Sequence, residues 1–298
     1  MNFPKIGVVV LTFNAEKYIK VCLDSLINNN YPNCTIIVVD NNSQDNTCHM
    51  LCDLFPGVKL IRNKKNLGYA GGNNIGIKYL LKKENCDYIL ILNDDTIVNK
   101  NIINELLKSL NNNAHNGIAG SVITYFDRPD RIWFAGGYLN KNFCFTRHSC
   151  MNKGIDILPD KGIVGFITGA CMMIKREVFE VAGFFSEDYF LYWEDVDFCQ
   201  RATNYGYKCY LVNKPLVKHM VSVSAGNSGK NTLSPIRAYY YARNPFLFME
   251  KNGFPKFSGI MGQMFIRFPY YLFSLENFFA FREYLRGIKD GFRYMLKI

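Results

Sequence analysis

The sequence predicts an α/β fold with a Rossmann-like, mostly parallel central sheet, flanking helices and a helical extension at the C-terminal end. Short, apolar, β-branched runs alternate with helical patterns in the first half of the 298-residue chain. Strands separated by helices imply right-handed crossovers, which make the strands parallel and place helices on both faces of the sheet. A basic, aromatic helical pattern then closes the chain.

The expected elements follow in order along the chain. The run IGVVVL at 6–11 is apolar throughout, as in a strand that is buried on both faces. Further strands are expected at 35–39, 58–62, 88–92, 170–175 and 208–212. Helices are expected at 16–29, 71–83 and 176–182, with an acidic helix start at 193–197. We expect one α/β domain over residues 1–245 and the helical extension over 246–298.

Charge and composition narrow the range of functions. A hydrophobic fraction of 49% excludes a disordered chain. The net charge is +10, and residues 251–298 hold eight Lys or Arg against three acids. Such an excess suits an anionic partner, whether nucleic acid, lipid headgroups or a phosphorylated substrate. The ten cysteines form no CxxC pair, and no secretory signal or membrane span is recognisable, so we expect a cytoplasmic protein.

Asn93-Asp94-Asp95 follows an expected strand directly. Ligands of such sheets bind beyond the carboxyl ends of the strands, where Asp40 is also expected. Adjacent carboxylates there are unfavourable unless a cation is present, and a hard divalent cation that bridges a diphosphate would remove the difficulty. Asp/Asn turn chemistry that closes the strand explains the tripeptide equally well.

The segment 193–197 (WEDVD) places three acids beside aromatic residues. One of them could be a general base, because apolar surroundings raise a carboxylate's pKa toward working pH. Acids in the first turn of a helix, favoured by its dipole, are the simpler reading. His219 follows an apolar strand and could bind a metal or simply donate a hydrogen bond. The glycine-rich stretch 66–74 could hold a phosphate on free N–H groups or merely begin a helix.

The C-terminal pattern from Phe278 predicts an amphipathic helix. Its apolar positions are Phe278, Phe281, Leu285, Ile288, Phe292 and Met295, and basic residues alternate with them. Such a helix can lie in a membrane interface or pack on its own domain. The aromatic run at 265–273 beside it favours peripheral contact with a membrane.

Several ordered motifs together resemble the inverting glycosyltransferases of family 2, which have the GT-A fold, over roughly residues 5–245. Among the subgroups, the rhamnosyl- and galactofuranosyltransferases look most similar. The motifs are VVLTFN (9–14), VVDNNS (38–43), NLGYAGGN (66–73), LNDD (92–95), GACMMI (169–174) and WEDVDFC (193–199).

The resemblance implies a role for each matching residue. Asp95 would coordinate Mg²⁺ or Mn²⁺ together with His219, while Asn93 replaces the family's first acid. Asp195 would be the catalytic base, and Glu194 would orient the acceptor or the base. Nucleotide-sugar contacts would come from Thr12, Phe13, Asn14, Asp40, Asn66, Gly68, Gly71, Asn73, Asn93, Asp94 and Trp193.

The resemblance further implies transfer of a sugar, with dTDP-rhamnose as our choice of donor, to a saccharide acceptor in bacterial surface polysaccharide synthesis. The basic, aromatic C-terminus suggests a lipid-linked acceptor at the inner face of the cell membrane. The oligomeric state stays open. Two alternatives are kept: a sugar-phosphate nucleotidyltransferase, and a non-catalytic nucleotide-sugar scaffold. We expect no nucleic-acid partner, because no binding signature accompanies the charge.

Overall fold

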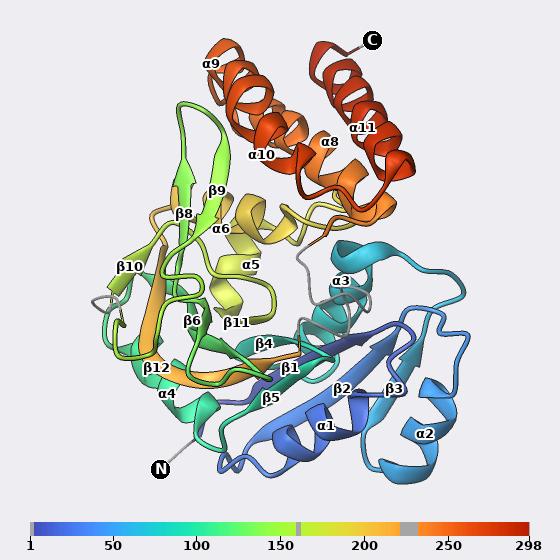
Figure 1. The fold of residues 1–298 in the computed structure, drawn as a ribbon. Coiled ribbons are helices and arrows are strands. Elements are labelled where there is room, and N and C mark those ends of the chain that lie inside the picture. Colours follow the sequence, from blue (N-terminus) through green and yellow to red (C-terminus); the bar gives the residue numbers. More distant parts are fainter. Residues whose placement is uncertain (1–2, 159–161, 221–231, 298) are drawn as a thin grey trace.

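The structure, a computed structural model, describes residues 3–158, 162–220 and 232–297. Its centre is one mixed sheet with the order β10-β12-β6-β11-β4-β1-β2-β3 (Figure 1), in which β5 also pairs with β12 and β7 with β6. A separate hairpin consists of β8 and β9. The strands are β1 (Ile6–Thr12), β2 (Cys34–Asp40), β3 (Lys59–Arg62), β4 (Tyr88–Asn93), β5 (Thr96–Val98), β6 (Asn116–Tyr125), β7 (Ile132–Phe134), β8 (Gly137–Asn140), β9 (Phe145–His148), β10 (Gly162–Val164), β11 (Cys171–Lys175) and β12 (Lys208–His219).

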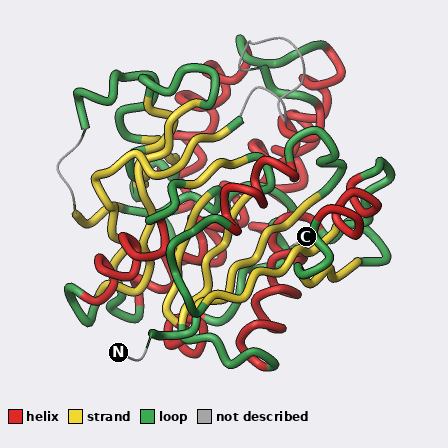
Figure 2. Tube along the Cα trace, turned by 90° about the horizontal axis from the view of Figure 1, so that it is seen from below, coloured by secondary structure: helices red, strands yellow, loops and turns green. Residues whose placement is uncertain are grey.

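Helices lie to either side of the sheet when the molecule is viewed from below (Figure 2). Those of the α/β part are α1 (Ile19–Ile27), α2 (Thr47–Leu54), α3 (Gly68–Lys82), α4 (Ile102–Asn111), α5 (Arg176–Ala182) and α6 (Glu194–Asn204). Those of the extension are α8 (Pro235–Asn252), α9 (Lys256–Met261), the π-helical turn η1 (Gly262–Arg267), α10 (Phe268–Leu272) and α11 (Phe278–Leu296).

Strand β1 is buried on both faces, as its apolar sequence predicts. It pairs in parallel with β2 on one side and with β4 on the other. Glycines of α3 let that helix lie close to the strand, because a Cβ at Gly72 would overlap Leu11 and one at Gly76 would overlap Val9. The residues between them in β1, such as Val10, are equally buried, so the opposite face is covered as well.

The parallel arrangement ends at β4. Strand β11 pairs antiparallel with both β4 and β6, and β6 then pairs in parallel with β12. The sequence did not reveal β6, a strand whose ten residues are all buried. Its glycines and polar residues interrupt the apolar run that marks the other buried strands, and a Cβ at Gly120 would overlap Ile167.

Helices α8 and α11 form the main body of the extension and pack along each other. The hairpin β8–β9 reaches up to α9 and η1 (Figure 1), where Gln263 Nε2 donates to Cys144 O at 2.6 Å. Helix α8 runs through residue 245, where we expected the domains to divide, and Phe246 and Phe248 belong to the main core. The division into two domains stays a prediction.

The buried face of α11 agrees with the predicted apolar pattern only in part: Met295 is buried and Ile288 and Phe292 pack against the core. Phe278 and Leu285 are exposed, whereas the small residues Gly287 and Gly291 face α8. A Cβ at either glycine would overlap a backbone carbonyl of α8 or a side chain beside it. Close approach of the two helix backbones therefore requires small residues at these two positions of the interface, while Phe278 and Leu285 stay outside. None of the helices among the described residues is both long and apolar enough to cross a membrane.

Candidate active site

The ends of three parallel strands bring the first group of predicted site residues together. Thr12 at the end of β1 lies opposite Asp40 at the end of β2, and Leu11 lies opposite Asn93 at the end of β4. Thr12 and Asp40 are fully buried. Each strand thus delivers its polar residue to one edge of the sheet, as the strand pattern predicts.

The loops after β1 and β2 support each other. The Asp40 carboxylate accepts the Ser43 N–H at 3.2 Å, and Ser43 Oγ accepts the Asn14 N–H at 2.8 Å. Asn14 has a left-handed backbone with φ of 54°. Between these two residues Phe13 is 44% exposed, and its predicted contact with a nucleotide sugar stays a prediction.

Asn41 ties the glycine-rich loop to this edge. Its Nδ2 donates to Gly68 O at 2.9 Å, and its Oδ1 accepts from Asn63 Nδ2 at 2.9 Å. Asn66 Oδ1 in turn accepts the Gly68 N–H at 2.8 Å. Gly68 has φ of 72°, and a Cβ there would overlap Phe190 O. Glycine is therefore required at this position for two independent reasons.

The other glycines of this loop also have packing reasons. A Cβ at Gly71 would come within 2.9 Å of Leu67 Cβ. Asn73 is fully buried and donates to Tyr69 O at 3.0 Å, while its Oδ1 has no hydrogen-bond partner among the described residues. Contacts of Gly71 and Asn73 with a nucleotide sugar stay predictions.

The acids after β4 lie in a strained electrostatic setting. Burial, and then the charge of Asp95, raise the pKa of Asp94 to about 8. Asp95 is almost completely buried and is the last residue of the two-residue turn before β5. A buried carboxylate that resists ionisation beside a second carboxylate indicates a place where a cation would be stabilised.

His219 lies directly against Asp95. Strand β5 pairs with the end of β12, with Thr96 opposite His219, and this register brings His219 Nε2 within 3.0 Å of Asp95 Oδ1. Trp133 packs edge-on against the imidazole, with ring centres 4.4 Å apart. The position of His219 is therefore fixed from two sides.

The donor set fits a divalent metal that shares its coordination with a ligand. No three His, Cys, Asp or Glu side chains converge on one point in the described ranges. Asp95 and His219 nevertheless present an oxygen and a nitrogen side by side, and Asp94 follows β4 directly. Mg²⁺ and Mn²⁺ are commonly held by a few protein groups plus substrate phosphates, which is the arrangement that this set allows.

Asp195 and Glu194 begin helix α6 and differ in their surroundings. Asp195 Oδ2 accepts the Gly169 N–H at 3.0 Å, and Oδ1 accepts the Val196 N–H at 2.8 Å. Glu194 is more deeply buried, and its Oε2 has no hydrogen-bond partner among the described residues. Burial raises the pKa of both acids, and for Glu194 the charge of Asp195 raises it further. Asp195 is therefore the more readily ionised of the two.

An unusual turn places these acids. Tyr192 and Trp193 have φ of 67° and 74°, two consecutive left-handed residues that are not glycine. Asn244 of α8 holds the turn, because its Nδ2 donates to Leu191 O at 2.8 Å and to Tyr192 O at 2.7 Å. The Trp193 ring packs on Phe248, so its predicted contact with the sugar stays a prediction.

Two backbone donors connect the end of β4, next to Asp94, with Asp195 through residues 169–170. The Asn93 N–H donates to Ala170 O at 3.2 Å, and the N–H of the preceding Gly169 donates to Asp195. Tyr69 Oη donates to Gly169 O at 2.7 Å. The structure thus brings Asn93, Asp195 and the glycine-rich loop to one place in the molecule.

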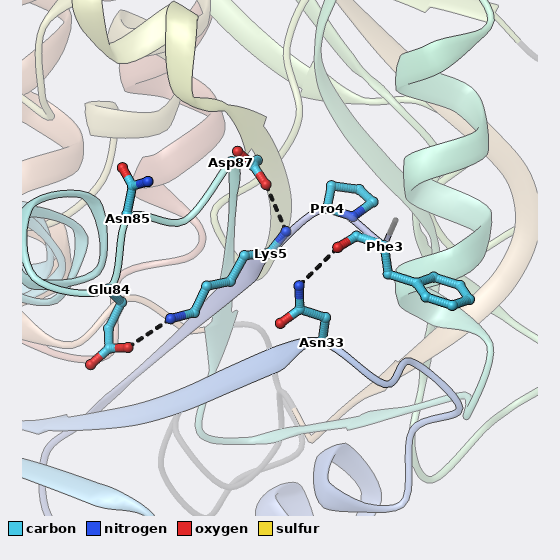
Figure 3. Close-up of a pocket in the computed structure, with 7 residues that line it drawn as sticks. All are labelled: Phe3, Pro4, Lys5, Asn33, Glu84, Asn85 and Asp87. Atoms are coloured by element: carbon cyan, nitrogen blue, oxygen red, sulfur yellow. Dashed lines mark hydrogen bonds and ion pairs between the residues drawn. The ribbon is translucent and has the colours of Figure 1, made fainter. Parts of the chain in front are cut away.

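Some contributors were not predicted. Asn41 and Tyr69 stand inside motifs that the sequence singled out, so their motif positions were the available signal. Trp133 and Asn244 gave no signal, because they are remote in sequence from the residues they support. A surface depression lined by Lys5, Asn33 and Glu84 lies at the amino end of β1, away from this site, and Lys5 Nζ pairs there with Glu84 Oε2 at 2.8 Å (Figure 3).

Residues 7–183 match the family model described as Glycosyl transferase family 2, which covers more than half of the chain. The chain belongs to this family. The predicted resemblance, the GT-A fold and the assignment as a glycosyltransferase enzyme are confirmed, and family membership decides against the two alternatives. The acids at 94–95 lie within the match, whereas Glu194 and Asp195 follow it.

Relatives cover nearly the whole of this glycosyltransferase. dTDP-rhamnosyl transferase RfbF of Shigella flexneri is 28% identical, over 96% of this chain and 97% of its own length. N-acetylglucosaminyl-diphospho-decaprenol L-rhamnosyltransferase of Mycobacterium tuberculosis is 23% identical, over 83% and 85%. The mannosyltransferase PcManGT from Pyrobaculum calidifontis, in complex with GDP-Man and Mn²⁺, has a TM-score of 0.59 at 15% identity, over 96% and 74%, which shows a common fold.

Proposed function

We propose that this glycosyltransferase moves rhamnose from dTDP-rhamnose to a hydroxyl of a lipid-linked saccharide, with inversion, in surface polysaccharide synthesis. The observation that carries the proposal is the hydrogen-bonded connection from Asn93 through Ala170 and Gly169 to Asp195. It puts the strand end that would hold the diphosphate beside an acid that could serve as base. The names of the rhamnosyltransferase relatives support the choice of sugar.

The chemistry follows from these positions. The Asp195 carboxylate would take the proton of the acceptor hydroxyl while that oxygen forms a bond to the anomeric carbon. The bond from this carbon to the diphosphate oxygen breaks at the same time, and the nucleoside diphosphate leaves with the electron pair. A single displacement from the far side inverts the anomeric centre. Burial raises the pKa of Glu194 and so favours its neutral form, which would donate a hydrogen bond to the acceptor.

Asp95 and His219 would hold a divalent metal, with Asp94 and Asn93 beside it. A bound Mg²⁺ or Mn²⁺ would act as a Lewis acid that stabilises the negative charge of the departing diphosphate. Phe13, Asn14, Thr12 and Asp40 would surround the nucleoside. The Mn²⁺ in the mannosyltransferase complex supports this part of the proposal.

The test is a transfer assay with purified protein. Nucleotide sugars are first screened with and without Mn²⁺ by thermal shift, because a donor that binds the folded state raises its stability. We expect dTDP-rhamnose with Mn²⁺ to give the largest shift and to yield a product of inverted anomeric configuration by NMR. A larger shift and faster turnover with a different donor would replace rhamnose as the sugar, and a retained configuration would overturn the mechanism.

The outer surface of the extension supports work at a membrane. Phe273 is 90% exposed, Phe278 80% and Phe265 73%. Arg282 and Lys289, also exposed, lie along the same outer side of α11 as Phe278. Exposed aromatic residues together with basic ones suit the interface of an anionic bilayer. This arrangement supports a peripheral position on the inner face of the membrane, where a lipid-linked acceptor would be found.

Vesicle sedimentation tests this part. We expect the protein to sediment with vesicles that contain phosphatidylglycerol and not with phosphatidylcholine alone, and the double variant Phe273→Ser, Phe278→Ser to lose binding. Ile163→Ser, an exposed apolar position on β10, is the matched control. Equal binding of the double variant and the wild type would exclude this surface.

A further inference from the structure

Beside Asp195, a group of tyrosines and arginines forms a cluster that the roles above do not use. We call Tyr192, Tyr241, Tyr271, Arg237 and Arg267 the acceptor-side cluster. The rings of Tyr192 and Tyr241 stack with centres 4.4 Å apart, and Tyr241 lies 5.4 Å from Tyr271. Because Tyr192 belongs to the left-handed turn that precedes Asp195, the cluster extends from the base into α8 and α10.

The two arginines of the cluster interact with tyrosines and not with acids. Arg267 Nη2 donates to Tyr271 Oη at 2.7 Å, and its guanidinium lies over that ring. Arg237 Nη1 donates to Thr232 O at 3.3 Å, while its Nε has no hydrogen-bond partner in the described part of the chain. Among the described ion pairs, neither arginine has a carboxylate partner. Both guanidinium groups are partly buried, and within the described ranges no carboxylate offsets the charge of either.

Both arginines of the cluster and Asp195 influence the same tyrosine, Tyr241. Burial raises the pKa of Tyr241, the positive charges of Arg237 and Arg267 lower it, and the negative charge of Asp195 raises it. All three groups therefore act electrostatically on Tyr241, whose ring stacks on Tyr192, a residue of the turn that precedes Asp195. An anion bound to the arginines would be close to the acceptor hydroxyl, from which Asp195 is proposed to take the proton.

Partly buried guanidinium groups are destabilising unless an anion offsets their charge. Their planar sets of N–H donors match phosphate oxygens, and tyrosine hydroxyls can add further donors. We infer that Arg237 and Arg267 form a subsite for a phosphate or diphosphate group of the acceptor. This inference rests on the proposed function and makes it more specific: the acceptor sugar would be attached to a phosphate, close to the hydroxyl that receives the new sugar.

The same arrangement indicates where the lipid part of such an acceptor would lie. Tyr271 and Arg267 belong to α10 and the turn before it, and the exposed Phe273 follows directly. The phosphate would therefore bind between the base and the aromatic outer surface of the extension. The acceptor sugar would then lie at Asp195 and its phosphate at the two arginines. The hydrocarbon chain would lie along the exposed aromatic residues.

Farnesyl diphosphate is a soluble probe of this subsite. Its affinity is measured by calorimetry in the presence of saturating dTDP and Mn²⁺, so that the donor site is already occupied. We expect Arg237→Gln and Arg267→Gln each to weaken binding about 10- to 100-fold, the loss typical of a charge-assisted hydrogen bond. Lys108→Gln, an exposed position on α4, removes the same charge and should leave the affinity unchanged.

The outcomes separate this inference from the proposed function. Thermal shift by dTDP reports whether each variant is folded and binds the donor nucleotide. No binding of farnesyl diphosphate by the wild type, or equal binding by both folded arginine variants, would overturn the subsite. If these variants lose binding to phosphatidylglycerol vesicles but not to farnesyl diphosphate, the arginines contact headgroups and the inference is wrong. Failure of the wild type to bind dTDP would contradict the proposed donor and not the subsite.

Discussion

Two pairs of adjacent acids stand at the site, Asp94–Asp95 after β4 and Glu194–Asp195 at the start of α6, and their surroundings differ. The first pair meets an imidazole, since His219 Nε2 lies 3.0 Å from Asp95 Oδ1. The second meets backbone N–H groups, which Gly169 and Val196 donate to Asp195. Two pairs of adjacent acids that look alike in the sequence can therefore suit different roles, and the groups that contact each pair distinguish these roles.

The surroundings of the two pairs also favour different charge states. The raised pKa of Asp94 indicates that positive charge would stabilise the first pair, which suits a metal and a diphosphate. In the second pair, two N–H donors favour the ionised form of Asp195, whereas deep burial favours the neutral form of Glu194. One pair is thus suited to hold a cation, and the other to divide the roles of base and hydrogen-bond donor.

The largest expected effect comes from the second pair. Asp195→Asn keeps the shape of the side chain and removes its basicity, so kcat should fall by about 10²- to 10⁴-fold. Sugar transfer is measured at saturating donor and acceptor, and dTDP binding by thermal shift should stay unchanged. Undiminished transfer would exclude Asp195 as the base.

The next effect concerns the first pair. Asp95→Asn should weaken the binding of Mn²⁺ in the presence of dTDP by at least about 10- to 100-fold. Removing a residue that only hydrogen-bonds to a metal ligand already costs about that much, and a ligand itself should cost no less. The affinity is followed by the EPR signal of free Mn²⁺. Asp127→Asn, an exposed acid after β6, is the control, and equal affinities of the two variants would refute a metal role for Asp95.

A smaller effect is expected from Asn244 of α8, which donates hydrogen bonds to the turn before the second pair. Asn244→Ala leaves two partly buried carbonyls without their donor, so stability should fall by about 1–3 kcal/mol in urea unfolding. We also expect kcat to fall while the donor KM stays the same, because the turn before Asp195 is released.

Asn252→Ala is the matched control for this position. It lies on the same helix and donates to Asp197, which also binds Arg201. A comparable loss of stability without a fall in kcat is expected for this variant. If the two variants show the same kcat, Asn244 does not position the base.

The smallest effect is a pH dependence of stability. The pKa of Glu194 is raised in the folded state, so its contribution to stability is full below the unfolded pKa, roughly 4.3, and is lost as pH rises toward the folded value. Glu194→Gln lacks this dependence. The variant's Tm relative to that of the wild type should therefore increase between pH 5 and pH 9, and a constant difference over this range would contradict the assignment.

Much of the site was predictable because its residues stand at the ends of regular strands. Thr12, Asp40 and Asn93 each follow an apolar run whose direction and burial the sequence shows, and parallel pairing brings such ends together. The outer face of α11 was not predictable in this way. The apolar pattern indicated one face, of which Ile288, Phe292 and Met295 do pack inward, but it gave no sign of the close backbone contact that Gly287 and Gly291 make with α8.

The sequence alone determined the alternation of strands and helices and the family, because burial with a period of two or of about 3.6 residues is written in local residue order. Only the tertiary structure decided which distant residues meet. The contact of His219 with Asp95 depends on the pairing of β5 with β12, and the turn before Asp195 accepts its hydrogen bonds from Asn244 of α8. Such contacts join segments far apart in the chain, so no local pattern can specify them.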